Sequence, residues 1–130
     1  GCDIDGRMVE IAKANAQAAE VSNDILFKQM RLQDLRSDKI NGVIISNPPY
    51  GERLSDDAGV TKLYAEMGEV FEPLKTWSKF ILTSDENFEK KFGRQADKKR
   101  KLYNGTLKVD LYQFFGERVR RQATSEKGNI

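Results

Sequence analysis

The chain has 130 residues and a net charge of +2, and 38% of its residues are hydrophobic, which fits a soluble protein with one domain and a modest core. No apolar run approaches the ~20 residues that a membrane-spanning helix needs, and the single cysteine excludes an internal disulfide and favours a reducing, cytoplasmic compartment. Histidine is absent, which excludes serine–histidine or cysteine–histidine catalysis and the usual zinc sites, so we expect no metal centre.

Basic residues are concentrated toward the C-terminus. Residues 88–130 carry 12 lysines and arginines against 5 acidic residues, whereas residues 1–87 carry 10 against 15. Such asymmetry indicates either a contact with nucleic acid or a solvated surface with a loose tail. Charge alone does not separate these two interpretations.

A strand remnant over residues 1–4 and a helix from Gly6 to about Glu20 open the chain. Asp5 precedes the helix and is placed to cap its free N–H groups. Asp3 ends the strand, where an acidic side chain binds ribose hydroxyls in many nucleotide-binding α/β folds, although an ordinary exposed carboxylate is the alternative. Apolar residues at helical spacing predict the buried face of the helix, namely Met8, Ile11, Ala12, Ala18 and Ala19.

Two further strands follow. The first, over residues 25–30, leads into a loop that contains Asp34, which by itself reads as an ordinary loop carboxylate. A polar linker over residues 36–41 separates it from the second, over residues 43–46. Because residues 43–45 are all β-branched, we expect this strand to be buried on both faces of the sheet.

The second of these strands ends abruptly in Asn47-Pro48-Pro49-Tyr50. Each proline lacks an N–H and fixes φ, so the segment predicts a stiff platform at the C-terminal end of a strand, where open α/β sheets bind ligands. The Asn47 amide oxygen and a proline carbonyl suit the two N–H groups of an exocyclic amine. Tyr50 offers a flat face for a base. The alternative is that the two prolines are only turn punctuation.

The rest of the chain predicts a polar lid over residues 51–59, a helix over 60–72, a strand over 80–83 and a short helix to about residue 92. In the lid, Arg53 is placed to pair with a phosphate or with a nearby carboxylate. Trp77 is expected to anchor the core.

Strands over 98–103 and 106–115 flank Asn104-Gly105, a strong hairpin signal, and residues 117–130 predict a flexible tail. The first arm of the hairpin is basic, with Lys98, Lys99, Arg100 and Lys101.

The string NPPYGERL at residues 47–54, together with GCDID at residues 1–5, resembles the THUMP-associated RNA methylases over residues 1–116. These enzymes use S-adenosylmethionine to methylate guanine N2 in large-subunit ribosomal RNA, and they are often labelled N6-adenine-specific DNA methylases. The resemblance implies an α/β fold of the Rossmann-like class I methyltransferase type that closes with an antiparallel hairpin. It also implies S-adenosylmethionine as the cofactor and ribosomal RNA as the partner.

The resemblance further implies that residues 1–116 are the C-terminal part of a catalytic domain. The first sheet strand, the glycine-rich loop and a THUMP domain are expected upstream of Gly1, so we expect the chain alone to be inactive. No glycine-rich loop of that kind occurs in the sequence.

The resemblance assigns roles to individual residues. It implies that Asp3 holds the ribose of the cofactor, that Asp5 is a cap or a second contact, and that Asp34 accepts a hydrogen bond from the cofactor's adenine amino group. Asn47 is assigned to both cofactor and substrate. The target amine is held by Asn47 and Pro48, with Pro49 as the stiffener and Tyr50 stacked on the base. Nucleic acid is expected to contact Arg53, Lys98, Lys99, Arg100 and Lys101.

Two alternatives stay open at this point. Asn-Pro-Pro-Tyr alone does not distinguish a guanine amine from an adenine amine, so an adenine-N6 DNA methyltransferase is one alternative. The other is a nucleic-acid-binding module that keeps the fold without turnover.

Overall fold

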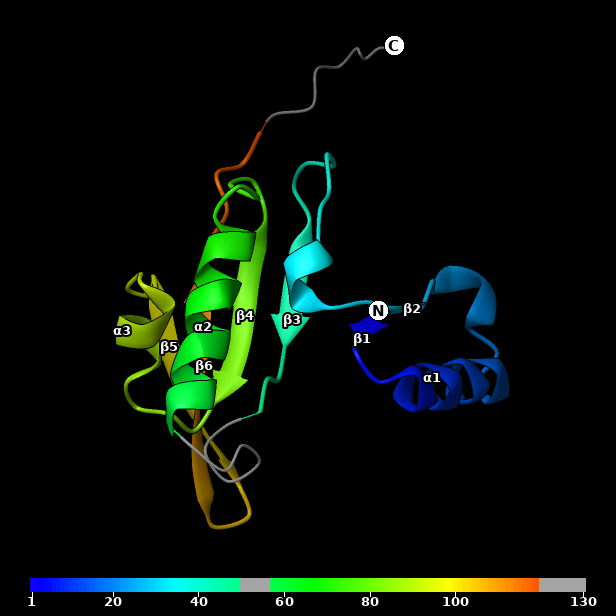
Figure 1. Cartoon of the computed structure of the whole chain (residues 1–130), viewed down its shortest axis with the longest axis horizontal. Helices are drawn as coiled ribbons and strands as arrows, with labels where there is room; N and C mark the ends of the chain where they lie inside the picture. Colours follow the sequence, from blue (N-terminus) through cyan, green and yellow to red (C-terminus); the bar gives the residue numbers. More distant parts are fainter. Residues whose placement is uncertain (50–56, 120–130) are drawn as a thin grey trace. The chain divides into compact units, whose positions relative to one another are not determined.

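The computed structural model describes residues 1–49 and 57–119 of the chain. Contacts divide it into two compact units, Gly1–Arg36 and Ser37–Ile130 (Figure 1). No helix of the described residues is long and apolar enough to cross a membrane.

The first unit is a strand–helix–strand crossover. Strand β1 (Cys2–Asp3) leads into helix α1 (Gly6–Ala18), and strand β2 (Lys28–Gln29) returns parallel to β1. A single 3-10 turn, Leu32–Asp34, follows β2. This order agrees with the sequence prediction, but the strand expected over residues 25–30 is shorter, because β1 offers only two residues to pair with it.

Helix α1 buries a different face from the predicted one. Val9 and Ala16 are its buried residues, and they lie seven positions apart, two helical turns along one face. Met8 and Ile11 are 45% and 51% exposed, so the predicted apolar stripe through them is wrong. Successive residues of a helix are rotated by about 100° around its axis, so Val9 and Ala16 lie on a face beside the predicted stripe and not at its centre. The predicted cap is confirmed, because the Asp5 side chain accepts the N–H of Arg7.

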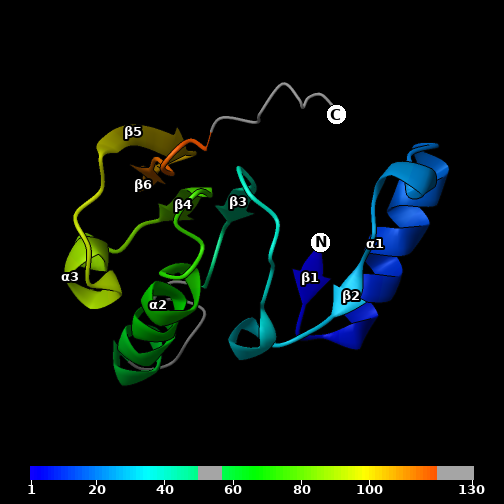
Figure 2. The same ribbon diagram turned by 90° about the horizontal axis from the view of Figure 1, so that it is seen from above.

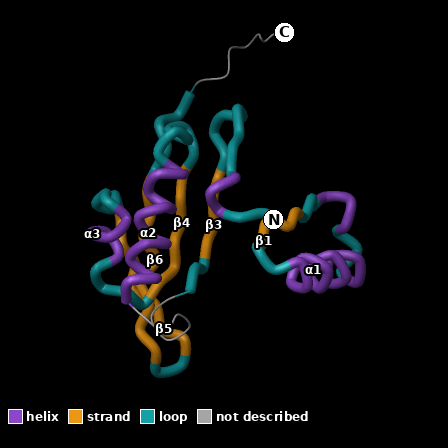
Figure 3. Tube along the Cα trace, viewed as in Figure 1, coloured by secondary structure: helices purple, strands orange, loops and turns teal. Residues whose placement is uncertain are grey.

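The second unit is a four-stranded sheet in the order β3-β4-β6-β5. Strands β3 (Val43–Ser46) and β4 (Ser78–Thr83) are parallel, and helix α2 (Asp57–Phe71) connects them (Figure 3). After helix α3 (Phe88–Phe92), strands β5 (Lys98–Asn104) and β6 (Leu107–Phe114) form an antiparallel hairpin whose second arm pairs with β4. The predicted mixture of a parallel crossover and a terminal hairpin is confirmed.

Both helices of this unit lie on the same side of its sheet (Figure 2). The core between them is aromatic. The ring of Phe88 lies with its centroid 5.0 Å from those of Tyr64 and Phe92, and 4.8 Å from that of Tyr112. Burial of each such side chain stabilises the fold by roughly 1.5–3 kcal/mol, and paired rings add to this. The buried residues of this layer are Val60, Tyr64, Met67, Phe71, Ile81, Phe88, Phe92, Tyr112 and Phe114.

Strand β3 is partly covered on one face and exposed on the other, so the prediction of burial on both faces is wrong. Val43 and Ile45 are 57% and 81% exposed. Ile44 pairs in register with Lys79, which is buried on the helix side of the sheet, and neighbouring side chains in a strand alternate between faces. Val43 and Ile45 therefore point to the other face, which neither described helix of this unit covers.

The hairpin turn lies one residue later than predicted. Asn104 pairs with Leu107, so the two-residue loop consists of Gly105 and Thr106. Gly105 has φ of +67°, a left-handed conformation that glycine adopts without a Cβ penalty.

Trp77 is predicted to anchor the core, but it is only half-buried and packs at the start of β3. Its indole packs so closely on Gly42 that a Cβ at that position would lie 2.4 Å from the ring. Its Nε1–H donates to the carbonyl of Lys39 at 2.8 Å. These contacts occupy both the face and the polar edge of the indole.

The described residues after β6 are held by hydrogen bonds. The N–H of Glu117 donates to the carbonyl of Lys75, and the side chain of Asn41 both donates to and accepts from the backbone of Val119. The remainder of the predicted tail, residues 120–130, lies outside the described residues.

Candidate active site

Three residues of the Asn-Pro-Pro-Tyr motif are described. They follow β3 directly, at the C-terminal end of a strand that is parallel to its neighbour, as the sequence predicts. Asn47 is exposed, Pro48 is buried and Pro49 is half-buried. Tyr50 and Arg53 lie outside the described residues. We call Asn47–Pro48–Pro49 the platform.

The platform is tied to the sheet through two hydroxyl groups. The Tyr64 hydroxyl of α2 donates to the Pro49 carbonyl at 3.1 Å and lies 2.8 Å from the Thr83 hydroxyl at the end of β4. Sequence analysis missed both residues as part of the site, because Tyr64 reads as one more member of an apolar helix face. The available signal was the phenol itself, since a buried tyrosine hydroxyl requires a hydrogen-bond partner.

The first unit holds the three acidic residues that were assigned to the cofactor. Asp3 ends β1 and is exposed, and its Oδ1 accepts the N–H of Asp5 at 2.8 Å. Asp5 in turn caps α1, with its Oδ1 2.9 Å from the Arg7 nitrogen. The carboxylate of Asp5 therefore has a structural role, whereas that of Asp3 stands at the strand end.

Asp34 lies at the end of the turn after β2. Its carboxylate forms an ion pair with Arg31, whose Nε lies 3.2 Å from Oδ2. The hydrogen bond and the charge of Asp34 raise the pKa of Arg31. Because both side chains are exposed, this pair contributes little to stability. Strands β1 and β2 are parallel, so Asp3 and Asp34 both follow C-terminal strand ends within this unit.

These carboxylates fit the donor set of an S-adenosyl cofactor. Its ribose hydroxyls and adenine amino group are hydrogen-bond donors, and exposed carboxylates after parallel strands are suitable acceptors. Among the described residues, no cluster of acidic or cysteine side chains could hold a metal ion.

The basic arm of the hairpin lies on β5, the edge strand of the sheet, and all four of its side chains are exposed. Alternation along the strand divides them between the two faces. Lys99 pairs in register with Tyr112 and holds its Nζ 5.7 Å from the centre of that ring. Lys98 and Arg100 point to the opposite face. The four charges therefore do not form one patch.

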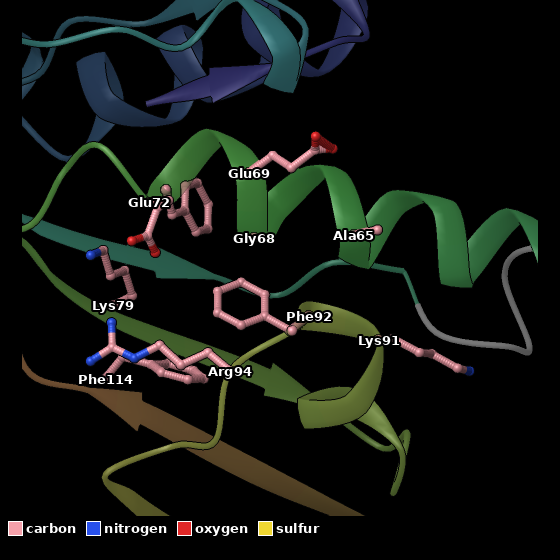
Figure 4. A pocket seen from close by; sticks show the side chains of 11 residues that line it. Ala65, Gly68, Glu69, Glu72, Lys79, Lys91, Phe92, Arg94 and Phe114 are labelled. Atoms are coloured by element: carbon pink, nitrogen blue, oxygen red, sulfur yellow. The ribbon is translucent and has the colours of Figure 1, made fainter.

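A pocket of about 350 Å³ lies between the helices and the sheet of the second unit (Figure 4). Lys79 lines it, near the start of β4, where its Nζ donates to the Leu74 carbonyl at 2.7 Å. Burial and the charge of Arg94 lower the pKa of Lys79. The platform, in contrast, follows the end of β3, and Thr83 ends β4. Lys79 thus lies at the opposite end of the strands from the platform, and no residue of the platform lines this pocket.

Comparisons with known proteins agree with this geometry. Residues 1–113 match the family model for the RMKL-like methyltransferase domain (UPF0020). The chain is 53% identical over 123 residues to the "Putative RNA methyltransferase YpsC" of Bacillus subtilis (strain 168), which covers 94% of this chain and 32% of that protein. It is 37% identical over 137 residues to the ribosomal RNA large subunit methyltransferase K/L of Shewanella amazonensis (strain ATCC BAA-1098 / SB2B). That match covers 100% of this chain and 19% of the Shewanella protein.

A solved structure shares the fold. The crystal structure of SMU.472, described as "a putative methyltransferase complexed with SAH", has a TM-score of 0.88 and 68% identity, and the match covers 92% of this chain and 32% of that one. The chain thus spans about a third or less of the length of these relatives. The predicted relationship to the RNA methylases and the predicted methyltransferase fold are confirmed, and the chain belongs to the RMKL-like methyltransferase domain family.

Proposed function

We propose that this chain is part of an enzyme that transfers a methyl group from S-adenosylmethionine to an exocyclic amino group of a nucleic-acid base. The most specific form of the proposal is guanine N2 in large-subunit ribosomal RNA. One observation carries it: the platform stands at the C-terminal end of β3, with its second proline carbonyl held by Tyr64. The names of the relatives, one an RNA and one a ribosomal RNA methyltransferase, support the substrate class.

The cofactor is proposed to bind through the first unit. Asp3 accepts hydrogen bonds from the ribose hydroxyls, and Asp34 accepts one from the adenine amino group. Asp5 keeps α1 capped. When bound, S-adenosylmethionine supplies an electrophilic methyl group on a sulfonium. Binding of Asp34 to adenine requires it to share or exchange its partner Arg31.

The target amine is proposed to bind at the platform. A base amine is a poor nucleophile because its lone pair is conjugated with the ring. The Asn47 amide oxygen and the Pro48 carbonyl accept hydrogen bonds from its two N–H groups, which draws the nitrogen toward tetrahedral geometry and frees the lone pair for in-line attack. The N–C bond would form as the S–C bond breaks, S-adenosylhomocysteine would leave, and the methylated amine would release its extra proton to water. Since the Pro49 carbonyl is already bonded to Tyr64, the Pro48 carbonyl is the one we assign to the amine. Positioning and stabilisation of the developing positive charge supply the rate.

RNA and the remainder of the protein are the proposed partners of this chain. Tyr50 stacks on the extracted base, and Arg53 and the basic arm bind phosphates. The whole protein is proposed to carry the first sheet strand, the glycine-rich loop and a THUMP domain upstream of Gly1, and to act in the cytoplasm.

The test is product analysis with the complete protein. Large-subunit ribosomal RNA and duplex DNA are each incubated with S-adenosylmethionine that carries a labelled methyl group, and the nucleosides are then separated. We expect N2-methylguanosine from the RNA, and none from the Asn47→Ala variant. N6-methyladenine in the DNA would instead support the adenine-specific alternative. Cofactor binding without transfer to either substrate would support the non-catalytic module.

A further inference from the structure

We propose that Tyr64 is a positioning residue for methyl transfer: its hydroxyl, oriented by Thr83, fixes the Pro49 carbonyl and thereby the acceptor pair formed by Asn47 and Pro48. This inference rests on the proposed function of the platform. It extends the site to two residues, on α2 and at the end of β4, that no motif marks.

The direction of each hydrogen bond follows from a count of protons. The N–H of Asp85 donates to the Thr83 hydroxyl oxygen at 3.1 Å, so that oxygen is an acceptor. The Thr83 proton is then available to the Tyr64 oxygen, 2.8 Å away, and the single Tyr64 proton goes to the Pro49 carbonyl at 3.1 Å. The result is one ordered chain of donors from the backbone after β4 to the platform.

Burial makes this series of hydrogen bonds rigid. Tyr64 and Thr83 are both 0% exposed. The Tyr64 ring packs edge-on against Phe88, with centroids 5.0 Å apart and planes at 72°. Hydrogen bonds in such a low-dielectric site are strong, and successive donors polarise one another. The phenol therefore holds one position.

The backbone of the platform transmits this constraint. The ring of Pro49 fixes its φ, so a single free torsion, ψ of Pro49, separates the Pro48 carbonyl from the Pro49 carbonyl. Holding the second carbonyl through Tyr64 thus limits the orientation of the first, which is the proposed acceptor for the amine. A small misplacement of such a group lowers catalytic rates by about 10²-fold.

The alternative is that the Tyr64 hydroxyl only satisfies its own burial, as buried polar groups generally do. The fold contains a matched control. Tyr112 is equally buried, its ring packs on the same Phe88, and its hydroxyl also donates to a backbone carbonyl, that of Asp85, at 3.2 Å. Tyr112→Phe therefore removes a comparable hydrogen bond from the Asp85 carbonyl and leaves in place the three hydrogen bonds that run from the Asp85 N–H through Thr83 and Tyr64 to the Pro49 carbonyl.

The experiment compares Tyr64→Phe with Tyr112→Phe in the complete protein. Single-turnover methyl transfer to large-subunit ribosomal RNA is measured beside the cofactor Kd, the RNA KM and the melting temperature. We expect Tyr64→Phe to lower the transfer rate by about 10- to 100-fold, with cofactor Kd and RNA KM within about 3-fold of the wild type. Tyr112→Phe is expected to keep the wild-type rate at a similar loss of melting temperature.

A second pair of variants guards against a Tyr64→Phe protein that fails to fold. Thr83→Val removes the hydroxyl that orients Tyr64 and should lower the transfer rate. Thr83→Ser retains the hydroxyl and should keep the rate close to that of the wild type. Equal rates for Tyr64→Phe and Tyr112→Phe, or for Thr83→Val and Thr83→Ser, with an active wild type would overturn the positioning role alone. A wild-type protein that binds cofactor but methylates no amine would overturn the proposed function, and this inference with it.

Discussion

The ammonium of Lys91 lies 2.6 Å from the carboxylate of Asp85, and the two side chains are only 14% and 13% exposed. This ion pair links α3 to the turn after β4, where Asp85 also accepts the N–H of Asn87. Removing one partner of a largely buried pair leaves the other charge uncompensated, which costs more than loss of an exposed pair.

We therefore predict that Lys91→Gln lowers the free energy of unfolding by about 2–4 kcal/mol. The control is Lys75→Gln, which breaks a 2.8 Å pair with Glu72 whose side chains are 60% and 62% exposed. That change should cost much less, because both charges of this pair are solvated with or without their partner. Urea denaturation midpoints measure both, and equal losses would show that the Asp85 pair is effectively solvated.

Asn47→Ala is expected to abolish methyl transfer while cofactor affinity stays nearly unchanged. The proposed ribose and adenine contacts of the cofactor, through Asp3 and Asp34, are retained in this variant, so the cofactor loses at most its contact with Asn47. The variant loses an interaction made chiefly in the transition state, worth on the order of 10²–10³ in rate. Single-turnover methylation beside a cofactor titration checks this. Turnover at the wild-type rate would reduce the platform to a stiff turn.

Asp3→Ala is expected to weaken cofactor binding by about 1–3 kcal/mol, the scale for losing a charged hydrogen-bond partner. Asp3 also accepts the N–H of Asp5, so the variant perturbs the start of α1. Asp5→Ala is the control, because it removes the helix cap at a cost of about 1 kcal/mol in stability and leaves Asp3 in place. Calorimetric titration with S-adenosylmethionine distinguishes them, and an unchanged Kd for a folded Asp3→Ala protein would contradict the ribose assignment.

The two faces of the basic arm are expected to contribute unequally to RNA binding. Lys99 is engaged with the Tyr112 ring, and Lys101 lies on the same face of β5 and pairs in register with the acidic residue Asp110, whereas Lys98 and Arg100 lie on the other face. The slope of log K for RNA binding against log salt concentration should become less steep by about 1–2 units when Lys98 and Arg100 are neutralised together. The change should be smaller when Lys99 and Lys101 are neutralised. If neither double variant changes the slope, the arm is a solvated edge that discourages strand pairing.

The stability of the second unit is expected to fall between pH 10 and 12 because of Tyr112. Burial, followed by the charges of Asp110 and Glu89, raises the pKa of its phenol to about 12. The unfolded chain releases this proton near pH 10 and the folded chain keeps it, so the stabilisation is complete below pH 10 and is lost as the pH rises to 12.

The total loss amounts to about 3 kcal/mol, at 1.36 kcal/mol per pKa unit. Burial lowers the pKa of Lys79, which gives that group the opposite pH dependence, but a comparison of wild type with Tyr112→Phe cancels it. Urea midpoints measured from pH 9 to 12 should therefore fall less steeply for Tyr112→Phe. Parallel curves would mean that the phenol titrates normally.

The sequence by itself determined the order of the elements, the Asp5 cap and the position of the platform. These features depend on residues that are close along the chain. A β-branched run followed by two prolines ends a strand wherever it lies, Pro73 ends α2 within two residues, and a glycine that tolerates positive φ places a hairpin turn to within one residue. Side-chain periodicity and backbone sterics are local properties, which is why they can be read without a fold.

Only the tertiary structure decided which faces are covered and which hydroxyls meet. Apolar residues occur on more than one side of α1, and packing on its own strands selected Val9 and Ala16. The β-branched residues of β3 fit a strand buried on either face, and the placement of the helices left Ile45 exposed. Tyr64 and Thr83 are 19 residues apart, and their hydroxyls meet at the platform only because α2 crosses back over the sheet before β4 begins. Contacts between distant residues depend on that crossover, and no local pattern encodes it.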